Sequence, residues 1–175
     1  MEPIEIVAKL KEKFPEEISD VLEFCGQISV SVKKDRIVDI CRYLHDDQEL
    51  HFDFLSDLCA VDYLGRKPRF EVVYNLYSIK LRHRIRLKAG VPEEDTDIDS
   101  ITPVWIGADW YEREAYDMYG IHFKGHPDLR RILMPEDWEG HPQRKDYPLK
   151  GPEKEYEGYE EIKKLHKNDD EWGIR

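Results

Sequence analysis

Amide side chains and cysteines are scarce in this sequence of 175 residues. It contains two asparagines and three glutamines, while charged residues make up 37% of the chain, against ~25% in an ordinary domain. High charge with few heat-labile amides is typical of thermophilic proteins. The three cysteines include no Cys-x-x-Cys pair and are too few for a four-cysteine zinc or iron–sulfur site. We therefore expect a thermophilic protein that holds no such cluster.

Long apolar runs and an excess of positive charge are also absent. No run of about 18 apolar residues occurs, so no segment is predicted to span a membrane. The N-terminus has neither the basic nor the apolar region of a signal peptide. Acidic residues outnumber basic ones by 38 to 27, whereas domains that hold nucleic-acid backbones are usually basic. These absences argue against a membrane-spanning protein and against a nucleic-acid partner.

Two helices are predicted in the first half of the chain. The first begins at Pro3, which suits a first helical turn, and ends at Phe14. The second follows Asp35, which has the character of an N-cap. Its apolar residues recur at helical spacing, at Ile37, Ile40, Cys41 and Leu44.

Strands are predicted at residues 24–32, 70–77 and 79–88, which are rich in β-branched and aromatic residues or alternate between apolar and polar ones. The last of them alternates strictly and places five basic side chains on one face: Lys80, Arg82, Arg84, Arg86 and Lys88. This basic face is either a solvated sheet surface or a docking surface for an acidic partner. The acidic loop at residues 92–97 is expected to lie against it.

A third helix is expected at residues 110–119. Asp109 and Glu112 have the spacing of a capping box near its start, and Gly120 stands where a left-handed cap would end it. Together, the helices and strands predict an α+β fold for residues 1–124. In this fold, helices pack on a small, mostly antiparallel sheet.

The chain changes character after residue 124. Residues 125–175 contain five of the ten prolines, and apolar residues are spread through the segment. Because prolines interrupt helices and strands, only residues 153–167 have a helical pattern. A proline-stiffened segment with spaced apolar residues is suited to lie along another protein. We therefore predict that residues 125–175 form an extended C-terminal arm that packs on a partner subunit.

Candidate metal ligands and nucleophiles give weak signals. The histidines dense enough to suggest a small metal-dependent hydrolase are His122, His126 and His141. Two of them precede proline, and His-Pro pairs more often fix turns than bind metal. The cysteines Cys25, Cys41 and Cys59 lie beside apolar residues, which predicts buried, unreactive thiols. The chain has no Gly-x-Ser-x-Gly elbow and no glycine-rich phosphate loop.

The most specific pattern runs from Trp110 to Leu133. A helix that carries several carboxylates ends at a glycine, and a Gly-His-Pro turn then leads to two adjacent arginines. The arginines need carboxylate partners, either on the same helix or on another protein. The residues concerned are Arg113, Arg130 and Arg131, with Glu112, Glu114 and Asp117. Physical chemistry alone predicts an ion-paired helix and turn that fix the direction of the arm.

At these residues the chain resembles a known family. The pattern consists of Glu112-Arg113-Glu114, Asp117-Met118-Tyr119-Gly120, Gly125-His126-Pro127 and Arg130-Arg131-Ile132-Leu133. It resembles the signature of the C subunit of NADH–quinone oxidoreductase, the thirty-kilodalton subunit of respiratory complex I. The resemblance covers residues 50–150.

The resemblance implies a peripheral-arm subunit of a proton-translocating NADH–quinone oxidoreductase, on the cytoplasmic side of the inner membrane. Such a subunit binds no cofactor and is not catalytic alone, whereas the whole complex uses NADH, FMN, iron–sulfur clusters and quinone. It meets the membrane only through the complex. Its C-terminal arm would pack on the large D subunit, which helps to form the quinone pocket, beside the B subunit, which holds the terminal cluster. We call these two the quinone-site subunit and the terminal-cluster subunit.

The resemblance also implies which residues organise the contact between subunits: Glu112, Arg113, Glu114, Asp117, His126, Arg130, Arg131, Asp146 and Tyr147. We call these the signature residues; they would act in assembly and not in electron transfer. Ferredoxin-linked quinone reductases and membrane-bound hydrogenases contain the same family, and the sequence has no donor site that chooses among them. The alternatives from other classes are the metal-dependent hydrolase and a free-standing interaction module.

Overall fold

A computed structural model gives the fold of the protein, and the residues it describes are 3–149. The helices of this part are α1 (Pro3–Lys13), α2 (Ile37–Asp46) and α3 (Ala108–Tyr119). Its strands are β1 (Ile18–Phe24), β2 (Gln27–Val32), β3 (Phe54–Asp62), β4 (Phe70–Tyr77), β5 (Arg84–Val91), β6 (Asp97–Asp99) and β7 (His122–Lys124). A 3₁₀ turn, η1 (Lys34–Arg36), precedes α2. The helix predicted at residues 153–167 lies outside the described residues.

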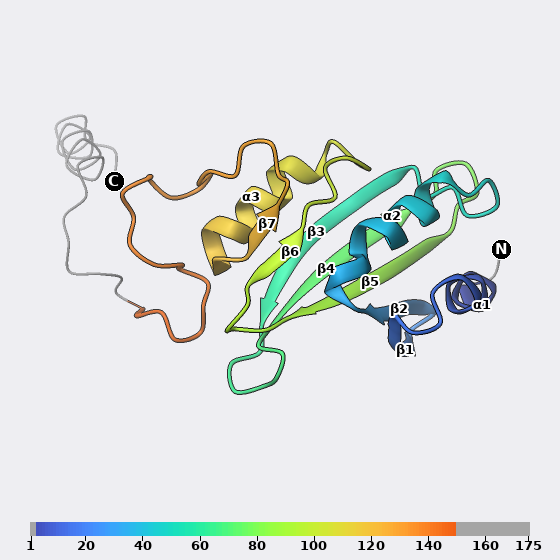
Figure 1. Ribbon diagram of the computed structural model, residues 1–175, viewed down its shortest axis with the longest axis horizontal. Coiled ribbons are helices and arrows are strands. Elements are labelled where there is room, and N and C mark those ends of the chain that lie inside the picture. Colours follow the sequence, from blue (N-terminus) through green and yellow to red (C-terminus); the bar gives the residue numbers. More distant parts are fainter. Residues whose placement is uncertain (1–2, 150–175) are drawn as a thin grey trace, which may run out of the picture.

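The main sheet has five strands in the order β1-β2-β5-β4-β3. The β2–β5 pair is parallel and the other pairs are antiparallel, while β6 and β7 form a separate parallel pair. α2 lies across one face of the sheet, and α3 lies alongside β3 (Figure 1). The predicted fold class, a mostly antiparallel sheet with helices packed on it, is confirmed.

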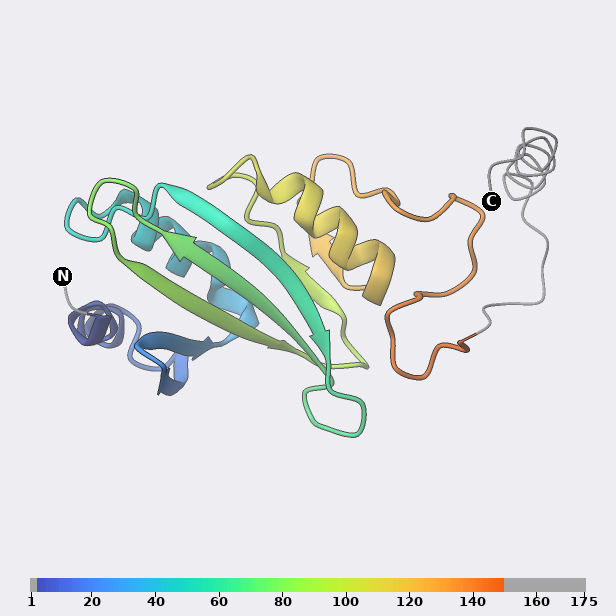
Figure 2. The ribbon, with the colours of Figure 1, turned by 180° about the vertical axis from the view of Figure 1, so that it is seen from behind.

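The core lies between α2 and one face of the sheet. The buried side of α2 is the predicted apolar stripe of Ile37, Ile40, Cys41 and Leu44. Alternate strand residues meet it, among them Val72, Tyr74 and Leu76 on β4 and Ile85, Leu87 and Ala89 on β5. Burying an aliphatic side chain of this kind contributes roughly 1.5–3 kcal/mol. No described helix crosses the opposite face of β3, β4 and β5 (Figure 2), which we call the open face.

Two predictions in the N-terminal half are wrong. The strand predicted at residues 24–32 is interrupted at Cys25, which forms the tight turn between β1 and β2 together with Gly26. Their φ angles of 51° and 72° are those of a two-residue hairpin turn, here without the usual Asn-Gly pair. Asp35 makes no N-cap, because it lies within η1 and α2 begins only at Ile37, without a side-chain cap.

The strand predicted at residues 79–88 begins only at Arg84. The residues before it form the turn between β4 and β5, in which the Ser78 N–H donates to the carbonyl oxygen of His83 at 2.9 Å. The buried His83 ring contacts the carbonyl oxygen of Leu50 through Nε2 at 2.6 Å and fixes the turn. Of the predicted basic face, only Arg84, Arg86 and Lys88 therefore lie on the sheet.

The acidic loop at residues 92–97 does not lie against this basic face, contrary to the prediction. Asp95 pairs with Lys34 at 2.5 Å, and Glu93 pairs with Arg69 at 2.5 Å. The loop leads from β5 to β6, and β6 packs beside η1, so Lys34 of η1 lies within reach of Asp95.

Candidate functional site

The signature residues lie on α3 and on the segment that follows β7. We call residues 125–149 the arm segment; it contains no helix or strand and runs past the carboxyl end of α3 (orange in Figure 1). α3 ends at Gly120, whose φ of 73° is that of the predicted left-handed cap. A Cβ here would lie 2.5 Å from His141 and 2.6 Å from Arg144, so the arm segment packs closely on the helix end.

Asp117 is the main anchor of the arm segment. Its buried carboxylate accepts the backbone N–H groups of Ile132, Leu133 and Met134 at Oδ2, at 3.1, 2.8 and 2.8 Å. Oδ1 pairs with Arg131 at 2.5 Å. Burial by itself would raise the pKa of this carboxyl, but the N–H donors and the guanidinium outweigh burial and lower the pKa. Asp117 therefore supplies acceptors that a neighbouring strand would otherwise provide.

The three arginines of the signature have different partners. Besides Asp117, Arg131 contacts two carbonyl oxygens further along the arm segment, at 2.8 and 3.0 Å. Arg113 donates to the carbonyl oxygens of Arg130 and Arg131, at 3.2 and 3.1 Å. Arg130 pairs with Asp128 on the surface. Of the three, Arg131 alone has a carboxylate partner on α3, and Arg113 instead ties the helix to the backbone of the arm segment.

A second anchor joins the arm segment to the sheet. Arg69, which immediately precedes β4, is buried and donates to both oxygens of Asp62 at 3.0 and 2.9 Å. The same guanidinium donates to Asp146 at 2.6 Å and to Glu93 at 2.5 Å. These bonds lower the pKa of Asp62 and of Asp146. Arg69 was not predicted from the sequence, in which the available signal was an acid and an arginine on either side of the β3–β4 turn.

Glu112 is buried beside the loop that precedes α3. It accepts hydrogen bonds from Ser100 Oγ at 2.6 Å and from the Ile101 N–H at 2.7 Å. Burial raises the pKa of its carboxyl to about 7, against the effect of these hydrogen bonds. The predicted capping box is wrong, because Glu112 serves this loop and the N-cap residue Gly107 makes no side-chain cap.

The other signature residues divide between buried and exposed positions. The side chain of His126 is buried, with Nδ1 accepting the Asp128 N–H at 3.0 Å and Nε2 lying 3.2 Å from the carbonyl oxygen of Asp109. Tyr147 donates its hydroxyl to a carbonyl oxygen of the arm segment at 3.2 Å. Glu114 is exposed on α3. Most signature residues therefore have partners within this chain.

The histidines considered as metal ligands have separate partners. His122 lies 3.2 Å from Asp97 on the surface, and Nδ1 of His141 lies 3.0 Å from the carbonyl oxygen of Asp117. Burial lowers the pKa of His141. Between residues 3 and 149, no group of three histidine, cysteine or acidic side chains is arranged to hold a metal ion. This part of the chain gives the hydrolase alternative no site.

Two of the three cysteines are exposed, so the prediction of buried thiols is wrong for them. Cys25 lies in the β1–β2 turn and Cys59 on β3, while Cys41 is buried on α2. Partial burial and the nearby carboxylate of Asp57 raise the pKa of the Cys59 thiol. A raised pKa makes a thiol a poorer nucleophile, so Cys59 has no sign of activation.

Comparison with known proteins decides the family. Residues 30–153 match the sequence model of a family described as "Respiratory-chain NADH dehydrogenase, 30 Kd subunit". The chain belongs to this family. A relative in Geobacter sulfurreducens, named as the C subunit of NADH-quinone oxidoreductase, is 56% identical over 154 residues, which cover 87% of this chain and 94% of the relative. A protein of the same name in Roseiflexus castenholzii is 56% identical over 144 residues, covering 82% and 83%.

Solved structures share the fold. A trypsin-resistant fragment (1–134) of Nqo5 has a TM-score of 0.61 and 32% identity, covering 74% of this chain and 100% of the fragment. A chain of the membrane-bound sulfane sulfur reductase, described as an archaeal respiratory membrane complex, has a TM-score of 0.70 over 93% of this chain and 91% of its own length. At 24% identity, the second likeness shows the fold alone.

Family membership makes the protein a member of a multisubunit oxidoreductase complex. The resemblance seen at the signature residues is thereby confirmed. None of the helices between residues 3 and 149 has the length and hydrophobicity needed to cross a membrane.

Proposed function

We propose that the protein is a cofactor-free scaffold subunit in the peripheral arm of a proton-translocating NADH–quinone oxidoreductase. In this proposal, residues 125–175 and the outer face of α3 pack on the quinone-site subunit, beside the terminal-cluster subunit. The assembly would lie on the cytoplasmic side of the inner membrane, where the other subunits carry the FMN and the iron–sulfur clusters.

The observation that carries the proposal is an exposed apolar surface shared by α3 and the arm segment. Ile106, in the turn that precedes α3, is 89% exposed, and Trp110, in the first turn of α3, is 64% exposed. Leu133, on the arm segment, is 59% exposed. Large apolar side chains gathered on a surface mark sites of contact with other proteins. We call Ile106, Trp110, Arg113 and Leu133 the contact face.

Arg113 joins the two halves of the contact face. Its guanidinium lies 5.6 Å from the centre of the Trp110 ring and donates to the backbone of the arm segment at Arg130 and Arg131. Because the helix and the arm segment are tied together by this side chain, a partner would meet a surface that is already in place. Preorganisation of this kind lowers the entropy cost of association.

The signature residues would act through this surface and not by chemistry. Asp117, Arg131 and Asp146 hold the arm segment on the chain, while Glu114 and Arg130 are exposed and available to a neighbouring protein of the complex. In the proposed complex, electrons would pass through other subunits, and this chain would maintain the positions of the quinone-site and terminal-cluster subunits.

The proposal is tested by purifying the tagged full chain from its host in mild detergent and identifying the accompanying proteins by mass spectrometry. The wild-type chain should recover the quinone-site and terminal-cluster subunits. Trp110→Glu combined with Leu133→Glu should reduce their recovery at least tenfold, because both charges would be buried against the partner. Leu22→Glu, at an equally exposed apolar position on β1, is the matched control and should retain them.

Two outcomes contradict the proposal: the wild-type chain recovered alone, or the double variant recovering the same subunits in the same amounts. The melting temperature of each lone chain should be unchanged, since all three positions are exposed. The remaining proteins in the preparation identify the electron donor. NADH-oxidising flavin subunits support the specific complex proposed, whereas ferredoxin-binding or hydrogenase subunits replace it with one of the related assemblies.

A further inference from the structure

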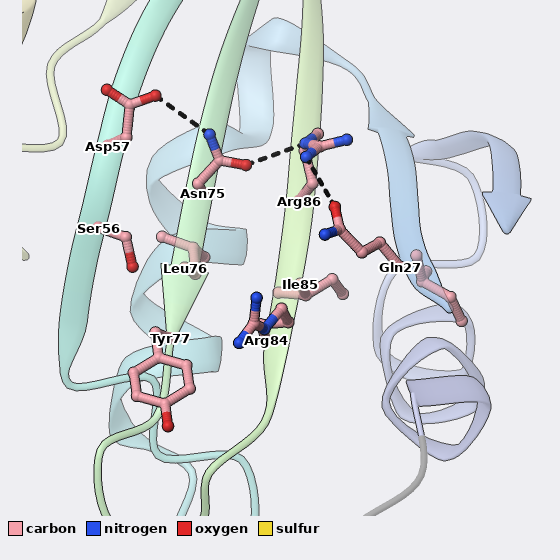
Figure 3. Close-up of a pocket in the computed structure, with 10 residues that line it drawn as sticks. Gln27, Ser56, Asp57, Asn75, Leu76, Tyr77, Arg84, Ile85 and Arg86 are labelled. Atoms are coloured by element: carbon pink, nitrogen blue, oxygen red, sulfur yellow. Dashed lines mark hydrogen bonds between the residues drawn. The ribbon is translucent and has the colours of Figure 1, made fainter. Parts of the chain in front are cut away.

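The open face of the sheet carries a polar groove that the contact face does not include (Figure 3). The groove has a volume of about 470 Å³ and crosses β2, β5, β4 and β3. Its polar lining includes Gln27, Asp57, Asn75, Tyr77, Arg84 and Arg86. Since Arg84 and Arg86 alternate with the buried Ile85 and Leu87, they project on the side of β5 that faces away from α2.

A ladder of side chains holds Arg86 in position across four strands. Its guanidinium donates to Gln27 Oε1 at 3.0 Å and, through Nε, to Asn75 Oδ1 at 2.9 Å. Asn75 in turn donates to Asp57 at 3.2 Å. Two of the five N–H groups of the guanidinium are thus used on neutral oxygens, and the others remain available to an acceptor. The ladder fixes a cation without neutralising it.

Arg84 gives the groove a second cation. Its guanidinium lies 5.8 Å from the centre of the Tyr77 ring, and among residues 3–149 it pairs with no carboxylate. Asp57 is the one acidic residue among residues 3–149 that lines the groove, and Asn75 already donates to it. The groove is therefore locally positive on a chain whose net charge is −11. Guanidinium groups held in place are suited to bind carboxylates in a bidentate manner.

An exposed aromatic side chain lies on the same face of the sheet, on β3, two strands away from Arg84 on β5. Phe54 pairs with Tyr77 in the β3–β4 register and is 47% exposed. A ligand that suits this site has carboxylates for Arg84 and Arg86 and an apolar group for Phe54. A nucleic-acid strand fits less well, because the net charge of −11 repels a chain of phosphates.

We propose that this groove docks an acidic peptide segment of another protein, with glutamate or aspartate side chains paired to Arg84 and Arg86. Under this proposal, Arg84 and Arg86 of the basic face belong to a docking surface and not to a merely solvated sheet surface. The groove is formed by the open face of the sheet and the contact face by α3 and the arm segment. The docking proposal does not depend on the proposed function, and a failure of one leaves the other standing.

The first test measures binding of a fluorescent peptide, Glu-Glu-Phe-Glu-Glu, to the full chain at low salt. Arg84→Gln combined with Arg86→Gln should weaken binding at least tenfold. Lys11→Gln with Lys13→Gln removes the same charge from exposed positions on α1 and should weaken binding less than twofold. Equal losses in both double variants would show non-specific attraction and overturn the proposal.

Single variants and a competitor complete this test. Arg84→Gln alone should also weaken binding severalfold. Because Arg84 is exposed, this variant is expected to fold normally, and it still tests the proposal if the substitution at Arg86 disturbs the sheet. A hexathymidylate that competes as well as the peptide would identify a phosphate-binding surface instead.

The second test places a photoreactive benzoylphenylalanine at Phe54 in the native complex. The expected crosslink joins this position to a segment of another protein of the complex that contains Asp or Glu within a few residues. The same group at Phe24, exposed on β1, is the control and should give no such crosslink. No crosslink from position 54, or one to a segment without acids, overturns the proposal.

Discussion

The strands and helices between Ile6 and Phe123 and the arm segment are held in place by different interactions. The buried apolar side chains of the described residues all lie in the first region, where α2 and alternate strand residues close on each other. The arm segment contributes none of them and is held mainly by Asp117, Arg131 and Arg69. Apolar burial is spread over many contacts, whereas each of these ionic anchors is a single group with directed bonds.

The two regions are expected to respond differently to substitutions. When a core side chain is replaced by a smaller one, the protein loses only part of the free energy of apolar burial that many residues share. The neighbouring side chains then relax partly into the space. Removing one member of an ionic anchor leaves the other member buried and unpaired. We therefore expect the effect of a substitution at an anchor to depend on where the unpaired partner lies. A partner buried in the sheet lowers the stability of the sheet, whereas a partner on α3 chiefly releases the arm segment.

The largest effect is expected for Arg69→Ala. The variant leaves Asp62 buried without its guanidinium, and breaking a buried pair in this way costs about 3–5 kcal/mol in the free energy of unfolding. Urea denaturation of the full chain measures it. Arg66→Ala, at an exposed position in the same turn, should stay within about 0.5 kcal/mol. A loss at Arg69 no larger than at Arg66 would show that this anchor does not stabilise the sheet.

The next effect depends on pH. The pKa of Glu112 is raised from 4.5 to about 7, so the stability it contributes is present in full below about pH 4.5 and is lost as pH rises through 7. The free energy of unfolding of the wild type, measured against Glu112→Gln, should fall by about 3 kcal/mol across that range. The pKa values of Asp62, Asp117 and Asp146 are lowered, so the stability that these carboxylates contribute is lost as the pH falls and not as it rises toward 7. A difference between wild type and variant that is constant from pH 4.5 to 7 would contradict the burial of Glu112.

A smaller effect is expected for Gly120→Ala, where the two regions touch. The positive φ costs about 1 kcal/mol for alanine, and the new Cβ displaces His141 and Arg144 from the helix end. Thermal unfolding measures the conformational cost, and the NMR chemical shifts of His141 report the displacement of the arm segment. Gly107→Ala is the control, since its φ is negative and no atom lies within 4 Å of the new Cβ. Unchanged shifts of His141 in Gly120→Ala would mean that the arm segment does not pack there.

Regular local patterns made much of the first region predictable from the sequence. The strand at residues 70–77 and the buried stripe of α2 follow directly from residue type and spacing. The turn at Cys25 was missed because it uses positive φ without an Asn-Gly pair, and the start of β5 because the alternation continues through a turn. The thermophilic character inferred from the composition stays a prediction.

The anchors of the arm segment were predictable only in part. Asp117 was one of several carboxylates expected to pair with the arginines of the signature, and the sequence did not single out its pair with Arg131. Arg69 was missed because its partners lie 7, 24 and 77 residues away, and such pairs leave no periodic pattern. The open-face ladder was missed for the same reason, since it joins side chains from four strands.

The carboxylate of Asp117 holds the arm segment on the chain, and amide hydrogen exchange of the lone full chain tests this role most directly. In the wild type, the amides of Ile132, Leu133 and Met134 should exchange at least tenfold more slowly than in an unstructured peptide. Asp117→Asn should remove this protection while the amides of β4 stay protected. Exchange at the unstructured rate in the wild type, or full protection in the variant, would contradict the account.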